Sequence, residues 1–274
     1  MTATTPSSLS GARTTARIIS YELSDVMRSR WLIAYGAFFL VVTEALLRFS
    51  GSGAKAALSL VNIVLFLIPL VTIVFGTMYL YHAREFVELL LAQPVRRRQL
   101  FTGLYLGLAA PLSLAFLIGL GIPYIIHGVD ETVQRGALAA LALAGVALTF
   151  VFTAIAMLIT VRTDDRVKGL GLAIGIWLLL AVLYDGLVLL GLLIFADYPL
   201  ESPALTLMMS NPIDLARVTM LLRFDAAALM GYTGAVLQRF FGSIGGSVLA
   251  GGALVLWTAV PVALGLRAFQ RKDF

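Results

Sequence analysis

A chain of 274 residues in which 60% are hydrophobic and 13% charged, with a mean hydropathy of +0.95, has more apolar surface than a soluble domain of this size can bury. Cysteine is absent, which excludes disulfides, thiolate metal sites and cysteine nucleophiles. The net charge of +5 comes without basic patches interleaved with aromatic residues, so it indicates lipid headgroups, and not nucleic acid, as its partner.

The chain begins with residues rich in Ser, Thr, Gly and Ala, and no acid precedes Glu22. We predict a disordered cytoplasmic tail over residues 1–14, with a transit peptide as the alternative. An amphipathic stretch follows from Thr15 to Arg30, with Ile19 and Leu23 on its apolar face. It predicts a helix in the membrane interface, whose last turn could equally be a cytoplasmic extension of the first span. Residues 15–274 are expected to form a single transmembrane domain.

Six long apolar stretches fill most of the chain. A membrane span needs about 20 apolar residues, because the hydrocarbon core is about 30 Å thick and a helix rises about 1.5 Å per residue. The stretches are apolar on every face, unlike the alternating strands of a barrel. They predict an all-α, polytopic membrane protein with six transmembrane helices, at about 31–47, 56–81, 100–126, 136–161, 170–196 and 244–266.

The connections predict the orientation of these spans. With six spans, both termini lie on one side of the membrane, and that side holds 14 Lys and Arg residues against 6 on the other. Basic residues concentrate on the cytoplasmic side. We therefore expect a multi-pass protein of the bacterial inner membrane, with both termini in the cytoplasm.

The connection after the second span, residues 84–99, has the pattern of a docking helix. An apolar face is flanked by acids, Pro94 disfavours a helical conformation at the residue before it, and three arginines follow. Such a helix at the membrane surface suits insertion into a groove of a soluble partner. An ordinary loop with arginines bound to lipid is an equal alternative. The residues concerned are Glu85, Phe86, Glu88, Leu89, Leu90, Pro94 and Arg97.

Two acids lie within spans. Glu44 is near the external end of the first span, and an i,i+4 pair with Arg48 is its favoured interpretation over a place on a transport pathway. Asp185, beside Tyr184, is deeper in the fifth span. A carboxylate at this depth normally faces protein or water, so Asp185 is expected either to line a pathway or to bond to another helix.

The longest connection, residues 197–243, lies on the external side. Asn211 fits a helix N-cap, with proline next and Asp214 in the first turn, where an acid meets the helix dipole. Arg217 can pair with Asp214. We predict short helices at the external surface that cap a pathway or bind an external partner. Met208 and Met209 are expected to form an adaptable apolar docking surface for an external partner rather than a Cu(I) site.

No catalytic or metal site is predicted. The two histidines, His82 and His127, are expected on opposite sides of the membrane, which argues against a histidine-based metal site within one subunit. The sequence contains no Walker-type glycine loop, GxSxG or HExxH motif.

The stretch from Glu88 to Gly103, ELLLAQPVRRRQLFTG, resembles the segment after the second span of ABC-2 type permeases. In that family this segment is the coupling helix that docks on a separate ATP-binding subunit. The resemblance implies a homodimer on two ATPase copies, with ATP and Mg in that partner and no cofactor in this chain. Two departures occur: the acidic lead-in of the family is replaced by Tyr81–Phe86, and its trailing Lys by Leu104.

Three further segments resemble the Nos-type branch of these permeases: Glu22–Leu32, Gly171–Trp177 with Leu183–Asp185, and Asn211–Arg217. That branch works with a cytoplasmic ATPase and a periplasmic repeat protein in maturing the copper sites of nitrous oxide reductase. A permease for another substrate, such as a drug, lipid or polysaccharide, is the alternative. An intramembrane lipid-modifying enzyme is disfavoured, because the ionisable groups within the spans are isolated.

Overall fold

The structure is a computed structural model, and it describes residues 26, 29–50, 53–92, 95–128, 132–195, 206–221 and 244–272. Across these ranges the chain is helical and contains no strand. The predicted tail over 1–14, most of the predicted interfacial helix over 15–30, and Gln93 and Pro94 lie outside the described residues, as do 196–205 and 222–243.

All six predicted spans are present as helices long and apolar enough to cross a membrane. Five are single helices: α2 (Arg30–Phe49), α3 (Gly53–His82), α5 (Arg97–His127), α6 (Thr132–Arg162) and α12 (Ile244–Arg271). The fifth span is composite, with α7 (Arg166–Leu178), the π-helix η1 (Leu179–Leu183) and α8 (Tyr184–Ile194) in succession. The fold class predicted from the sequence is confirmed.

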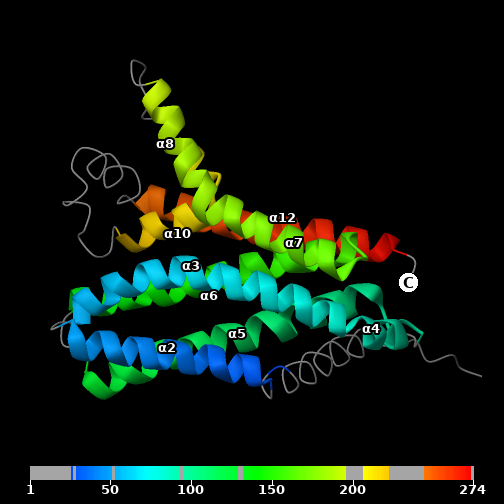
Figure 1. Ribbon diagram of the computed structural model, residues 1–274, viewed down its shortest axis with the longest axis horizontal. Helices are drawn as coiled ribbons and strands as arrows, with labels where there is room; N and C mark the ends of the chain where they lie inside the picture. Colours follow the sequence, from blue (N-terminus) through cyan, green and yellow to red (C-terminus); the bar gives the residue numbers. More distant parts are fainter. Residues whose placement is uncertain are drawn as a thin grey trace, which may run out of the picture.

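Helix α6 forms the centre of the bundle, packed against α3, α5 and α12, while α2 packs on α5 (Figure 1). The contact between α2 and α5 depends on small residues. A Cβ placed on Gly119 would lie 2.6 Å from the carbonyl oxygen of Gly36, so these two backbones approach too closely for any side chain at 119. Small residues allow this kind of approach between membrane helices.

The fifth span bends at η1. Helix α7 runs along the bundle, whereas α8 diverges from it (Figure 1). A π-helix widens the turn and is a recognised cause of kinks, often at functional positions. The helices that contain Pro69, Pro111, Pro123 and Pro261 continue through them without a break.

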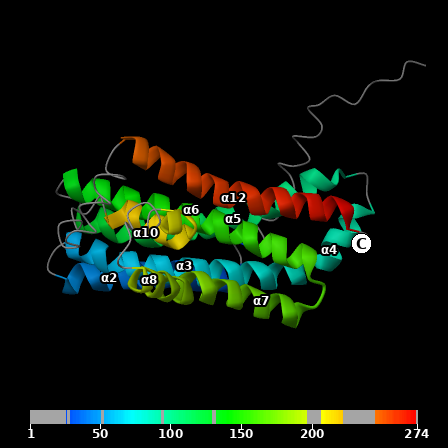
Figure 2. The same ribbon diagram turned by 90° about the horizontal axis from the view of Figure 1, so that it is seen from above.

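Two short helices mark opposite parts of the bundle. Helix α4 (Arg84–Leu91) lies near the C-terminal end of α12, and we call this the α4 end (Figure 1). Helix α10 (Pro212–Leu221) lies toward the other end, and it packs against α6, α12, α3 and η1 (Figure 2).

Candidate functional site

Helix α4 presents one polar stripe to the solvent. Glu85, Glu88, Leu89 and Ala92 are exposed, and their spacing of i, i+3, i+4 and i+7 places them on one face. Leu89 is 68% exposed and lies beside the two acids. Arg84 pairs with Glu88 at 3.4 Å along the same helix. The stripe is therefore an acidic surface with one large apolar side chain, Leu89, in it.

The opposite face of α4 holds the helix on the bundle. Val87 is buried, and Leu90 and Leu91 pack against the core. The sequence pattern grouped Leu90 with Phe86 and Leu89 on a docking face. In the structure Leu90 turns inward, Phe86 is half-buried, and Leu89 alone of the three is exposed. This division follows from the helix period, because residues 89 and 90 are about 100° apart around the axis.

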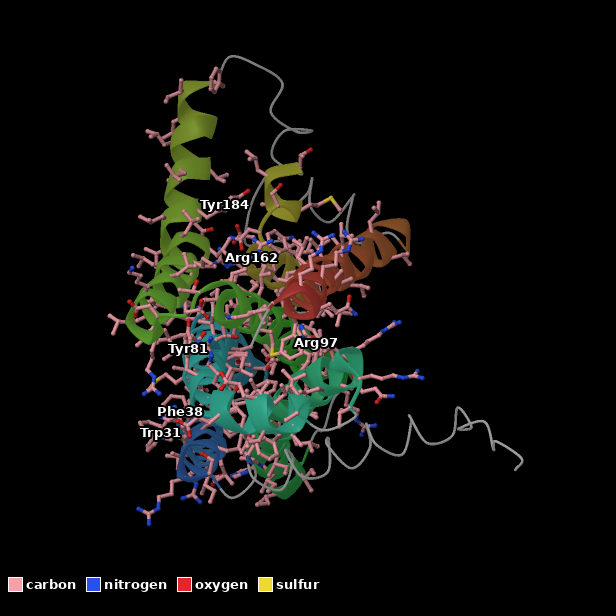
Figure 3. All side chains as sticks on the ribbon, turned by 90° about the vertical axis from the view of Figure 1, so that its right-hand side faces the viewer. Trp31, Phe38, Tyr81, Arg97, Arg162 and Tyr184 are labelled. Carbon is pink, nitrogen blue, oxygen red and sulfur yellow. The ribbon has the colours of Figure 1, made fainter. Side chains whose placement is uncertain are left out.

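Arg97 does not join the exposed stripe. Its Nη1 donates hydrogen bonds to the carbonyl oxygens of Phe269, Gln270 and Lys272, at 3.4, 3.1 and 2.6 Å. A cation there satisfies carbonyls left open by the last turn of α12. Figure 3, which looks onto the α4 end, labels Arg97, Tyr81 and Arg162. Arg96 and Arg98, in contrast, are exposed.

The second group of predicted residues meets where α10 touches the fifth span. Arg217 Nη1 donates to Oδ2 of Asp185 at 2.7 Å and to Oδ1 of Asp214 at 3.0 Å. The pairing of Arg217 with Asp214 was predicted from their spacing. The bond to Asp185 matches one of its two predicted roles, a bond to another helix, and leaves its role on a pathway a prediction. One guanidinium thus joins α10 to α8.

Asn211 adds a second link between α10 and the fifth span. Its Oδ1 accepts from the backbone N–H of Ile213 at 3.0 Å, as expected of the residue before the first helical turn. Its Nδ2 donates to Oδ2 of Asp214 at 3.0 Å and to the carbonyl oxygen of Leu180, inside η1, at 2.9 Å. The helix start was predicted; the bond to the π-helix was not.

Burial distinguishes this cluster from an exposed docking surface. Asn211 is 0% exposed and Asp214 is 8% exposed, because most of α10 is enclosed by the spans. The sequence predicted short helices at the external surface; α10 is short, but these two side chains are covered. They therefore position α10, and neither is available for direct contact with another protein.

The pKa of Asp214 is raised above its ordinary value. Burial is the main cause, and the neighbouring carboxylate of Asp185 adds to it, while Arg217 and Asn211 act in the opposite direction. Two acids share one cation here, so the cluster has a surplus of negative charge when both are ionised. Protonation of Asp214 would remove that surplus.

We call the contacts of Asn211, Asp214 and Arg217 with Leu180 and Asp185 the α10 clamp. Tyr184 supports it from the side, since its hydroxyl donates to the carbonyl oxygen of Leu207 at 2.6 Å. Tyr184 is labelled in Figure 3. A groove of about 440 Å³ lies beside the clamp, lined by Arg217 and by residues of α3, η1 and α10, namely Asn62, Ile63, Leu65, Phe66, Leu67, Ala181 and Ile213. The clamp thus borders open space between the helices.

Comparison with known proteins decides the family. The profile described as "ABC-2 family transporter protein" matches residues 16–274, nearly the whole chain. The chain belongs to the ABC-2 transporter permease family. It is also 30% identical over 268 residues to the "Probable ABC transporter permease protein NosY" of Pseudomonas aeruginosa, covering 92% of this chain and 96% of that one. A protein of the same name from Stutzerimonas stutzeri is 28% identical over 274 residues, with the same coverage.

In this ABC-2 permease, Glu44 makes the predicted i,i+4 contact. Arg48 Nε donates to Glu44 Oε1 at 2.6 Å, and His127 Nδ1 lies 3.5 Å from Glu44 Oε2. The acid therefore lies between α2 and α5 at the end of the bundle opposite α4. His82, at the opposite end of the bundle on α3, donates from Nδ1 to the carbonyl oxygen of Met78 at 2.7 Å. The two histidines are at opposite ends, as predicted.

The methionines of the permease's α10 region pack inward. Met208 and Met209 are half-buried and contact a small core formed by Leu215, Val218 and Ala250. Trp257 of α12 donates from Nε1 to the carbonyl of Met209 at 3.2 Å. These thioethers fill space between α10 and α12. In the part of the chain that the structure describes, no three His, Cys, Asp or Glu residues lie together in a way that could hold a metal ion.

Proposed function

We propose that this permease is the membrane subunit of an ABC transporter and that α4 docks in a groove of a separate cytoplasmic ATPase. The observation that carries the proposal is the exposed stripe of Glu85, Glu88, Leu89 and Ala92 on a helix whose other face is anchored in the bundle. An anchored helix transmits force to the spans, whereas a loosely attached one would not. Hydrolysis of ATP, with its Mg, belongs to that partner.

The side chains of the stripe indicate what kind of groove in the ATPase would bind it. Leu89 supplies one large apolar side chain, and Glu85 and Glu88 place negative charge beside it. A complementary groove would have an apolar floor and basic residues on its rim. Arg96 and Arg98, which are exposed nearby in the chain, would face lipid phosphates or acids of the ATPase.

The proposed orientation puts the α4 end in the cytoplasm. The arginines at 84, 96, 97, 98, 162 and 166, together with Lys168 and Lys272, all lie at or next to helix ends on that side. This asymmetry fits the preference of basic residues for the cytoplasmic face. The bacterial inner membrane is then the location, with both termini inside.

A homodimer follows from the number of docking helices. One chain supplies one α4, and ABC transporters close two ATPase subunits on each other. Apolar side chains such as Leu187, Leu189, Leu190 and Leu193 are more than half exposed on α8. We propose that the first and fifth spans lie near the dimer axis, where part of this surface would be covered.

The external role is proposed from the α10 clamp. Because α10 is bound to the bend of the fifth span, a movement of that span would move the external segment with it. We propose that this movement gates a pathway or signals to a periplasmic repeat protein, in copper-site maturation of nitrous oxide reductase. The similarity to proteins named NosY supports this choice. Transport of another substrate is the second candidate.

Truncation of Leu89 tests the docking of α4. Leu89→Ala should reduce copurification of the ATPase about tenfold or more, since a central apolar side chain in a groove is typically worth over 1 kcal/mol. Val167→Ala is the matched control, because Val167 is an exposed apolar residue at the same end, 79% exposed against 68% for Leu89. It should leave copurification unchanged. Equal retention of the ATPase by both variants would refute the docking role of α4.

A further inference from the structure

The three-residue connection between α6 and α7 receives contacts from three other elements. Tyr81, in the last turn of α3, donates from its hydroxyl to the carbonyl of Thr163 at 2.8 Å. Arg84, the first residue of α4, donates from Nη2 to Oδ1 of Asp164 at 2.8 Å. Lys272, beyond the end of α12, donates from Nζ to the same Oδ1 at 2.6 Å. One carboxylate oxygen therefore joins α4, the start of the fifth span and the end of the sixth.

The next residue begins the fifth span. Asp165 accepts from the backbone N–H groups of Val167 and Lys168, at 2.8 and 3.2 Å, and so forms the N-cap of α7. Asp164 is thus one residue from a fixed helix start. A displacement of Arg84 acts on α7 through a single peptide unit and not through a flexible loop.

Close packing of Tyr81 on α7 makes this junction stiff. A Cβ built on Gly169 of α7 would overlap the phenol ring of Tyr81, so the ring from α3 packs directly on the backbone of α7. Lys272 also donates to the carbonyl of Val161 at 2.9 Å, which ties the C-terminal residues to the end of α6. The ends of four helices and the start of α4 therefore meet around residues 163–165.

A contribution to folding stability alone does not account for the ion pairs of Asp164. Its side chain is 69% exposed, and ion pairs at exposed positions contribute little to folding. Hydrogen bonds from Lys272, and then from Arg84, hold the pKa of this carboxyl below its ordinary value, so it stays ionised and paired near neutral pH. The other charged groups at this junction are Asp165, capping α7, and the exposed Arg162, Arg166 and Lys168.

We propose that Asp164 is a positioning residue that carries displacement of α4 into the fifth span, and through its bend at η1 to α10. The inference rests on the proposed docking of α4 on an ATPase and adds the route by which that docking reaches the other side of the membrane. The route is continuous in the structure. It runs from Arg84 to Asp164, from Asp165 into α7, along α7 to η1, and from Leu180 and Asp185 to α10.

The first experiment tests whether Asp164 holds α4 in place, in the chain alone reconstituted in lipid nanodiscs. The natural chain has no cysteine, so Ala92→Cys gives a single site for a spin label at the end of α4. Asp164→Ala should increase the mobility of this label, and Asp164→Glu should restore it in large part. Lys168→Ala removes an exposed charge from the neighbouring first turn of α7 and should leave mobility unchanged. Unaltered mobility in Asp164→Ala would overturn the proposal whether or not an ATPase binds.

The second experiment tests transmission in the complex with the ATPase. A single cysteine at Ser210→Cys, an exposed position before α10, reports on that segment through its labelling rate with a membrane-impermeant maleimide. A non-hydrolysable ATP analogue should change this rate by about fivefold, the lower end of typical coupling between sites. Asp164→Ala should abolish the change while the ATPase still copurifies, and Asp164→Glu should keep it.

The outcomes separate this inference from the proposed function. If the ATPase does not copurify with the unmodified chain, the docking of α4 is refuted. The transmission route that depends on docking is then refuted with it. A bound ATPase with the same nucleotide-dependent change in Asp164→Ala would show that Asp164 is only a solvated surface pair. A bound ATPase with no change in the parent chain would show that α10 does not respond to the ATPase, which also overturns the proposal.

Discussion

Arg217 and Asp185 are 32 residues apart in the chain, and a hydrogen bond of 2.7 Å from Nη1 to Oδ2 joins them. The same Nη1 also binds Asp214. One cation therefore holds two carboxylates that would otherwise repel each other across the contact between α8 and α10. The consequences of removing the cation and of removing one acid are different.

Replacing Arg217 should lower the stability of the fold more than removing the charge of Asp185. Arg217→Gln leaves two neighbouring acids without their cation, whereas Asp185→Asn leaves Arg217 paired with Asp214 and relieves repulsion. We expect the double variant to be more stable than Arg217→Gln alone, with a coupling of about 0.5–3 kcal/mol, the usual range for residues in one network. Thermal unfolding of the four proteins in detergent measures it. Strict additivity would show that the two residues do not act together.

Asp185→Leu tests whether the contact between α8 and α10 matters for activity as well as for stability. It removes the hydrogen bond from Arg217 that joins α10 to α8. It also replaces a carboxylate in a span with an apolar side chain, so the protein should still insert into the membrane. We expect transport, or activation of the external partner, to fall more than expression does. Assays normalised to the amount of membrane-inserted protein are the measurement. Full activity at equal expression would mean that the α10 clamp has no part in function.

Asn211→Ala should cost more than an ordinary helix cap. Loss of a cap costs about 1 kcal/mol, but Asn211 is fully buried and also binds the carbonyl of Leu180, which would lose its side-chain partner. We therefore expect Asn211→Ala to lower the free energy of unfolding by about 2 kcal/mol. Asn211→Asp is the discriminating variant, because it keeps the capping acceptor but cannot donate to Leu180. Hydrogen exchange of α10 amides should increase in both, and retention of protection in Asn211→Asp would mean that the bond to η1 is unimportant.

The sequence predicted the spans well because they are long. Twenty or more apolar residues have few other solutions in a protein of this size, and both the number and the approximate limits of the helices were predicted. The start of α10 was predicted for a local reason: Asn211 at the N-cap, Pro212 at the first helical position and Asp214 at the third describe a helix start whatever surrounds it. The pairs Glu44–Arg48 and Asp214–Arg217 followed from helical spacing.

The features that escaped prediction depend on contacts between distant segments. Nothing in residues 179–183 indicates a π-helix, and its Leu180 carbonyl is recognisable as an acceptor only once α10 lies against it. Nothing in the sequence singles out Asp164, because its partners Arg84 and Lys272 are 80 and 108 residues away. Leu90 was placed on the docking face because an apolar side chain on a surface helix can face a partner or its own bundle, and periodicity does not distinguish the two.

The raised pKa of Asp214 predicts that stability falls as pH rises. Between the ordinary value of 3.8 and its raised value, the folded chain keeps a proton on Asp214 that the unfolded chain releases. The free energy of unfolding therefore decreases through this range, by at most about 1.4 kcal/mol per pH unit. Asp214→Asn should flatten the dependence. Unfolding midpoints of both proteins between about pH 5 and 7 test this, and parallel curves would contradict the assignment to Asp214.

Gly119→Ala should destabilise the contact between α2 and α5. The added Cβ would lie 2.6 Å from the Gly36 carbonyl oxygen and 2.8 Å from Cβ of Phe39, and a backbone atom cannot move aside as a flexible side chain can. Overpacking of this kind costs about 1–3 kcal/mol. Gly121→Ala is the matched control on the same helix, since its Cβ would meet nothing within 4 Å. Alanine favours helix over glycine, so Gly121→Ala should be neutral or slightly stabilising. Thermal unfolding compares the two, and an equal effect would mean that the helices separate easily and that this close approach does not hold α2 in place.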